Sequence, residues 1–127
     1  MLASDIMTRT VFTTSPQASV QAVAQLLYQE RISGVPVIDD NGQLIGMITE
    51  ADIIRNIHCN DLLVADIMSR HLVVVHEDTP VSDIAALLNE RKVKRVPVVR
   101  TGQVVGIVSR ADIVQAVALG HLVIRQW

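Results

Sequence analysis

Hydrophobic residues follow two patterns along this chain, one with the spacing of a helix and one with the continuity of a buried strand. Helical spacing occurs within residues 19–30, and two apolar runs follow it, at residues 35–38 and 44–48. Near-continuous apolar runs of this length are typical of strands that are buried on both faces. The pattern therefore predicts a long amphipathic helix followed by a pair of strands.

The same order returns in the second half of the chain. Thr79 and Pro80 predict a helix start, with a capping hydroxyl and a proline at the first helical position, and an apolar stripe follows them. Two further apolar runs come next, at residues 96–99 and 104–108. A last helix is expected from residue 111 to about residue 118, with Gly120 as its stop.

Turn-forming residues separate the two strands of each pair. Residues 39–42 read Asp-Asp-Asn-Gly, and Thr101-Gly102 stands at the matching place in the second half. Both are typical of hairpin turns. A short β-rich run at residues 11–13 precedes the first long helix and predicts one parallel strand pairing through a crossover. Each half is thus expected to form a small mixed sheet covered by helices.

The two halves match residue by residue. Asp5-Ile6-Met7 returns as Asp66-Ile67-Met68 at an offset of 61, and Gly46-Met-Ile-Thr-Glu-Ala-Asp52 returns as Gly106-Ile-Val-Ser-Arg-Ala-Asp112 at an offset of 60. The single deletion falls in the turn near residues 39–42, where a structural repeat tolerates it. The sequence predicts two tandem repeats, residues 1–61 and residues 62–127.

Composition limits the classes of partner. The chain has 13 acidic and 11 basic residues, a formal charge of −2, and only 2% aromatic residues. Without a long basic run or stacking aromatics, nucleic-acid binding is disfavoured. Hydrophobic residues make up 50% of the chain, and a half of about 60 residues buries too little surface alone. We therefore expect the halves to pack together and the chain to form a homodimer.

The remaining reactive side chains predict neither catalysis nor a metal site. The single cysteine, Cys59, has no partner for a disulfide, which favours a cytoplasmic protein. The four histidines lack metal-ligand spacing, and no nucleophile stands beside a base, so we expect no enzyme. The longest uncharged apolar stretch, residues 113–124, is too short to cross a bilayer, and we expect no membrane association.

The repeated polar segment is the candidate for chemistry. Thr49 and Asp52, like Ser109 and Asp112, have the spacing of a capping box at a helix start, and capping alone is the structural alternative. The glycine three residues before each hydroxyl would leave room for a ligand. Free amides at a helix start favour a phosphate, and a carboxylate in the first turn can accept the hydroxyls of a ribose. Together these groups predict a nucleotide.

These motifs resemble those of a known family. A segment of hydrophobic-x-x-hydrophobic-proline occurs at residues 32–36 and 93–97, and a segment of Gly-x-x-[Ser/Thr]-x-x-Asp occurs at residues 46–52 and 106–112. The chain thereby resembles a stand-alone pair of cystathionine β-synthase (CBS) domains, known as a Bateman module, over essentially its whole length. The resemblance implies an α+β fold of two β-α-β-β-α repeats about a pseudo-twofold axis, with two clefts for adenosine-type ligands.

The resemblance also implies roles for particular residues. The acids would hold ribose hydroxyls, the cap hydroxyls would contact ribose or phosphate, the valine-proline pairs would line the adenine slot, and two short segments would flank the base. In that order, these residues are Asp52 and Asp112; Thr49 and Ser109; Val35, Pro36, Val96 and Pro97; and Thr8, Arg9 and Thr10 with Ser69, Arg70 and His71.

The two repeats differ in charge at their candidate sites. Lys94 and Arg95 precede the proline in the second repeat where the first has Ser33-Gly34, and similar basic pairs contact phosphate in AMP-binding members of the family. Arg110 adds a third positive charge. For Arg91 and Lys92, a solvated helix end is an equal alternative to a phosphate contact.

We therefore expect a regulatory module that binds an adenosine-type ligand, AMP, ADP, ATP or S-adenosylmethionine, and signals occupancy to an unidentified protein partner. No cofactor is required, and the regulatory ligand is expected to be AMP, ADP or ATP. The alternative is a ligand-independent dimerisation or protein-interaction adaptor in which the capping boxes serve only the fold. Direct nucleic-acid binding through Lys94 and Arg95 is a third, weaker alternative.

Overall fold

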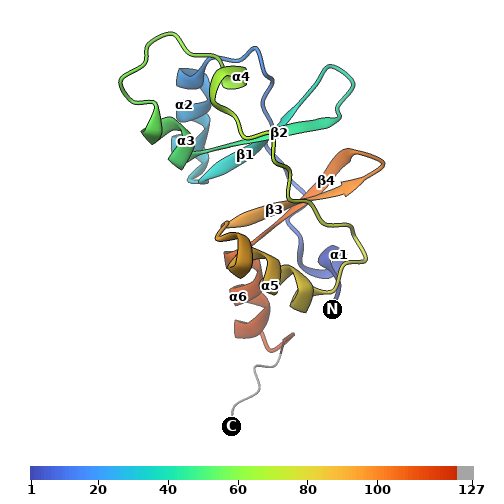
Figure 1. Ribbon diagram of the computed structural model, residues 1–127. Coiled ribbons are helices and arrows are strands. Elements are labelled where there is room, and N and C mark those ends of the chain that lie inside the picture. Colours follow the sequence, from blue (N-terminus) through green and yellow to red (C-terminus); the bar gives the residue numbers. More distant parts are fainter. Residues whose placement is uncertain (123–127) are drawn as a thin grey trace. The chain divides into compact units, whose positions relative to one another are not determined.

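The computed structural model of the chain describes residues 1–122. They form two compact units (Figure 1). The continuous unit is Phe12–Leu72, and the split unit joins Met1–Val11 to the chain from Val73 onward. The last two residues of the apolar stretch at 113–124 lie outside the described part. Within residues 1–122, no helix is long and apolar enough to cross a bilayer.

Each unit holds one antiparallel hairpin and its covering helices, so the α+β class expected from the sequence is confirmed. In the continuous unit these elements are α2 (Val20–Glu30), β1 (Gly34–Ile38), β2 (Leu44–Thr49), α3 (Glu50–Arg55) and α4 (Val64–Ile67). In the split unit they are α1 (Ala3–Ile6), α5 (Val81–Arg91), β3 (Arg95–Arg100), β4 (Gln103–Ser109) and α6 (Arg110–Ala118).

The hairpin turns have the predicted chemistry. Thr101 and Gly102 both have positive φ, as a two-residue hairpin turn requires. In the longer turn, the Asp39 carboxylate accepts hydrogen bonds from the amides of Asn41 and Gln43, each at 2.9 Å. The one-residue difference between the repeats is therefore absorbed where no strand pairing depends on it.

Two local predictions are wrong. The β-rich run at residues 11–13 forms no strand, and the parallel pairing is reduced to single bridges of Thr14 with Val37 and of Val75 with Val98. Helix α5 begins one residue later than expected, with Pro80 at the N-cap. The Thr79 hydroxyl instead accepts from the His76 amide at 2.9 Å, so it stabilises the preceding turn rather than the helix.

The segment at the start of each repeat packs in the unit formed by the strands of the other repeat. Helix α1 contacts β4 and α6, and Thr8 exchanges two backbone hydrogen bonds with Ile107, at 2.8 and 3.0 Å. Ser69 forms the same pair with Met47 in the continuous unit, at 2.8 and 3.0 Å. Both compact units therefore combine residues from the two sequence repeats.

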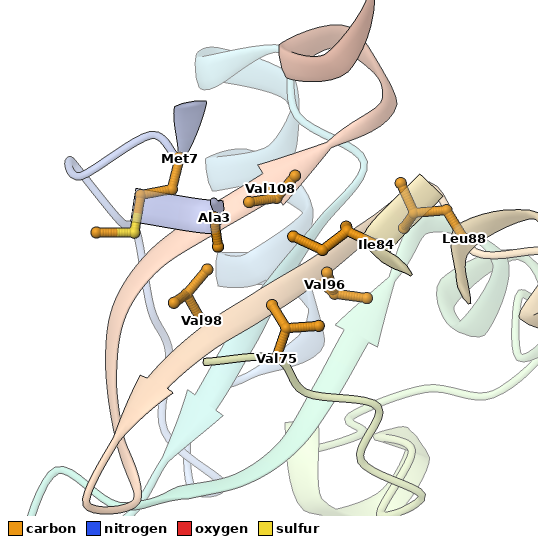
Figure 2. Packing of buried hydrophobic residues seen from close by; sticks show 8 residues of the cluster. All are labelled: Ala3, Met7, Val75, Ile84, Leu88, Val96, Val98 and Val108. Atoms are coloured by element: carbon orange, nitrogen blue, oxygen red, sulfur yellow. The ribbon is translucent and has the colours of Figure 1, made fainter. Parts of the chain in front are cut away.

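This exchange explains the repeated Asp-Ile-Met motif. The Asp5 carboxylate accepts from the Leu2 amide at 2.7 Å and so stabilises the first turn of α1. Met7 is buried in the hydrophobic core of the split unit with Ala3, Val75, Ile84, Leu88, Val96, Val98 and Val108 (Figure 2). Met68 belongs to the equivalent core of the continuous unit.

Candidate functional site

The split unit brings Thr8 and Asp112 together although they are 104 residues apart in the sequence. Ser109 ends β4 and is the N-cap of α6, and its hydroxyl accepts from the Asp112 amide at 3.2 Å. In return, Asp112 Oδ2 accepts from the Ser109 amide at 2.8 Å and from its hydroxyl at 3.0 Å. The other carboxylate oxygen, Oδ1, accepts from the Thr8 hydroxyl at 3.0 Å. The capping box predicted from the sequence is therefore formed through Oδ2. The other oxygen, Oδ1, takes no part in the capping box and accepts from a hydroxyl outside the helix.

Three basic residues lie at this helix start or on the strand paired with it. The Arg110 amide donates to the Lys94 carbonyl at 3.0 Å, and Arg95 pairs with Ser109 across the hairpin. The Arg110 guanidinium donates to the Val93 carbonyl at 3.3 Å, and the side chains of Lys94 and Arg110 are exposed. We call Thr8, Ser109 and Asp112 with these three basic residues the Asp112 site.

The continuous unit repeats this geometry with a different charge. Asp52 Oδ2 accepts from the Thr49 amide at 2.9 Å and from its hydroxyl at 3.1 Å. Ser33 and Gly34 replace the basic pair, and Glu50, whose amide donates to the Ser33 carbonyl at 2.8 Å, replaces Arg110. We call Thr49 and Asp52, together with Glu50, the Asp52 site. The positions occupied by Lys94, Arg95 and Arg110 in the split unit thus carry three positive charges, and the matching positions of the continuous unit carry one negative charge, that of Glu50.

The second oxygen of Asp52 has a partner that the sequence analysis missed. Asp52 Oδ1 forms an ion pair with Arg55 of the same helix, three residues along. Asp52 is only 5% exposed, whereas Asp112 is half-buried. The spacing of an acid and an arginine at i and i+3 was the signal available in the sequence, since such pairs meet on one helix face.

The glycines before each hydroxyl serve packing. A Cβ on Gly106 would lie 2.5 Å from the Met7 sulfur, and a Cβ on Gly46 would lie 2.8 Å from the Met68 sulfur. The interpretation that these glycines leave room for a ligand is therefore wrong, because the methionines of the leading segments fill that space.

The other expected site residues are divided between the two units and differ in exposure. Val35, Pro36, Val96 and Pro97 are fully buried in β1 and β3, and their contact with an adenine ring stays a prediction. Arg9 donates to the Ser4 carbonyl at 3.2 Å. Thr10 is exposed in the split unit, and so are Ser69, Arg70 and His71 in the continuous unit.

One further ion pair lies in the split unit. Arg100 donates to both carboxylate oxygens of Glu77, at 2.6 and 2.7 Å. This hydrogen bonding lowers the pKa of Glu77, with weaker attraction from Arg9. The pair joins the loop before α5 to the end of β3. Among residues 1–122, no three histidine, cysteine, aspartate or glutamate side chains form a group that could hold a metal ion.

Comparison with known proteins identifies the family. The family model of the CBS domain matches residues 3–59 and 64–119, nearly the whole chain. The chain belongs to the CBS domain family. The CBS domain pair of protein MJ0100, solved with 5′-methylthioadenosine and S-adenosyl-L-methionine, has a TM-score of 0.88 at 31% identity, over 94% of this chain and 98% of that one. CBSX2 of Arabidopsis thaliana, solved with AMP, has a TM-score of 0.88 at 30% identity, over 95% and 98% of the two chains.

A curated relative is much longer than this CBS pair. The L-aspartate semialdehyde sulfurtransferase of Methanocaldococcus jannaschii is 34% identical over 113 residues, which are 88% of this chain and 22% of that protein. The chain thus spans about a fifth of that relative's length. Its named activity is a property of the whole relative.

Proposed function

We propose that this CBS pair is a regulatory module that binds a phosphate-bearing adenosine ligand at the Asp112 site. The hydrogen bond from the Thr8 hydroxyl to Asp112 Oδ1, at 3.0 Å, supports this most directly. A ribose hydroxyl is chemically the same donor, so it would replace Thr8 without leaving the carboxylate unpaired.

The charges beside Asp112 favour a phosphate. The positive end of the α6 dipole, Lys94, Arg95 and Arg110 all lie at the start of this helix, and charge-assisted hydrogen bonds to phosphate are stronger than neutral ones. We therefore favour AMP, ADP or ATP over the uncharged or cationic adenosine ligands bound by the MJ0100 pair.

The proposed role is to report occupancy of the site. Thr8 belongs to the leading segment Met1–Val11, which packs on β4 and α6. A ligand that displaces the Thr8 hydroxyl from Asp112 would change how firmly this segment is held, and an unidentified protein partner would respond to that change. We infer a regulatory role rather than a catalytic one, and a cytoplasmic setting from the lone Cys59.

A thermal-shift panel tests ligand binding. AMP, ADP, ATP and S-adenosylmethionine are each added to the ligand-free protein. A ligand at one hundred times its dissociation constant stabilises a fold by about 2.7 kcal/mol, so the melting temperature should rise by roughly 10 °C. We expect this rise with at least one of the three nucleotides. No shift with any of the four ligands would contradict the proposal.

We further propose that the chain forms a homodimer through exposed apolar helix residues. Ile54 of α3 and Val114 of α6 occupy equivalent positions in the two repeats and are 67% and 65% exposed, and Leu119 is 61% exposed. A second copy of the chain would remove this surface from water. Sedimentation at tens of micromolar should give the mass of a dimer, and a monomer there would contradict the proposal.

The alternative function is a dimerisation or interaction adaptor that needs no ligand. The same exposed helix residues favour it. The start of each helix is also a sufficient explanation for each capping box, without a ligand. The two functions differ in what Asp112 does. In an adaptor, Asp112 would stabilise the fold and have no role in binding a ligand.

A further inference from the structure

The two acids at the helix starts differ in the partner of their second carboxylate oxygen. Asp112 Oδ1 accepts a hydrogen bond from a neutral hydroxyl, that of Thr8. Asp52 Oδ1 instead pairs with the Arg55 guanidinium. These two oxygens occupy equivalent positions in the two repeats. A ligand hydroxyl would therefore compete with a different protein side chain in each unit.

The difference follows from one position in the sequence. At the offset of 60 that aligns Asp52 with Asp112, Arg55 aligns with Gln115. Each stands three residues after the acid of its own helix, α3 or α6, and side chains at this spacing reach one another. Gln115 carries no charge, so the guanidinium that pairs with Asp52 from this position has no counterpart three residues after Asp112.

The two partners are not equally easy to displace. A ribose hydroxyl that replaces Thr8 exchanges one neutral donor for another. A ribose hydroxyl that replaces Arg55 exchanges an ion pair, in which both partners are charged, for a hydrogen bond in which only the carboxylate is charged. The Arg55 side chain is 68% exposed, so solvent weakens its attraction, but the Asp52 side chain beneath it is only 7% exposed. A ligand would have to move Arg55 before reaching the acid.

We infer that Arg55 is a specificity-determining residue that excludes ribose from Asp52, so that each chain binds one nucleotide, at the Asp112 site. This inference rests on the proposed function. The local charge acts in the same direction, because Glu50 stands where the Asp112 site has Arg110. A phosphate beside Glu50 would meet repulsion rather than attraction.

Moving the arginine to the other repeat tests this inference. Gln115→Arg places a guanidinium three residues after Asp112, on an exposed position of α6. Isothermal titration with AMP should give one site per chain in the unaltered protein and an affinity lower by about tenfold or more in Gln115→Arg. The added positive charge alone would attract the phosphate, so weaker binding would identify competition for the carboxylate.

A matched control separates this competition from a general effect of charge. Ala118→Arg adds the same side chain to the same helix at another exposed position, six residues after Asp112, and should leave the AMP affinity unchanged or slightly higher. Two equal sites in the unaltered protein, or an unchanged affinity in Gln115→Arg, would overturn the role of Arg55 and leave the proposed function standing. No binding of AMP, ADP or ATP to the unaltered protein would overturn both.

Discussion

Asp112→Asn should weaken AMP binding by about 10- to 100-fold, while the protein stays folded. The substitution removes the charge that strengthens hydrogen bonds from ribose hydroxyls, and hydrogen bonds to charged groups contribute about 1.5–3 kcal/mol. Ser109 remains as the N-cap of α6, so the free energy of unfolding should fall by about 1 kcal/mol or less. Isothermal titration and urea denaturation measure the two effects.

Asp52→Asn is the matched control for this prediction. It makes the same chemical change in the same kind of capping box, but at an acid whose second oxygen pairs with Arg55. We expect the AMP affinity of this variant to stay within about twofold of the unaltered value. Equal losses of affinity in both variants would point to a general effect on the fold. Unchanged affinity in Asp112→Asn would favour the ligand-independent adaptor.

Gly106→Ala should lower the free energy of unfolding by about 1–3 kcal/mol. The new methyl group would lie 2.5 Å from the Met7 sulfur and 2.9 Å from its Cγ, so the methionine would have to leave its place in the core. Overpacking of a well-packed interior has a cost of this size. Urea denaturation followed by circular dichroism measures the change.

A second substitution tests whether Met7 is the cause. A Met7→Ala background removes the sulfur and Cγ contacts and leaves the Cβ of residue 7 at 3.2 Å, so Gly106→Ala should cost at least about 1 kcal/mol less there than it does alone. Met7→Ala itself should cost about 2–5 kcal/mol, because Met7 is buried in the core of the split unit. An equal cost of Gly106→Ala in both backgrounds would show that the contact between the leading segment and β4 does not explain this glycine.

Local sequence signals were sufficient to predict most of the helices and strands. The apolar runs and the turn residues between them predicted both hairpins, because these signals lie within a few positions of each other in the sequence. Ser19 caps α2 by accepting from the Ala22 amide at 3.0 Å. Both capping boxes also formed as expected, because a hydroxyl and an acid three residues later need no distant partner.

Features that depend on distant parts of the chain were not predicted. The repeat pattern showed that residues 5–7 and 66–68 match, but not that each leading segment packs in the unit formed by the strands of the other repeat. For the same reason, Gly106 was interpreted as room for a ligand rather than for Met7. The pairing of Thr8 with Asp112 also spans most of the chain, and no local pattern indicates which acid that hydroxyl meets.

A crystal of the protein soaked with AMP tests the proposed site most directly. We predict density for one nucleotide per chain, with its ribose hydroxyls within hydrogen-bonding distance of the Asp112 carboxylate and its phosphate beside Lys94, Arg95 or Arg110. Density for AMP at Asp52 alone, or no nucleotide at Asp112 in a crystal that leaves this site open, would contradict the account.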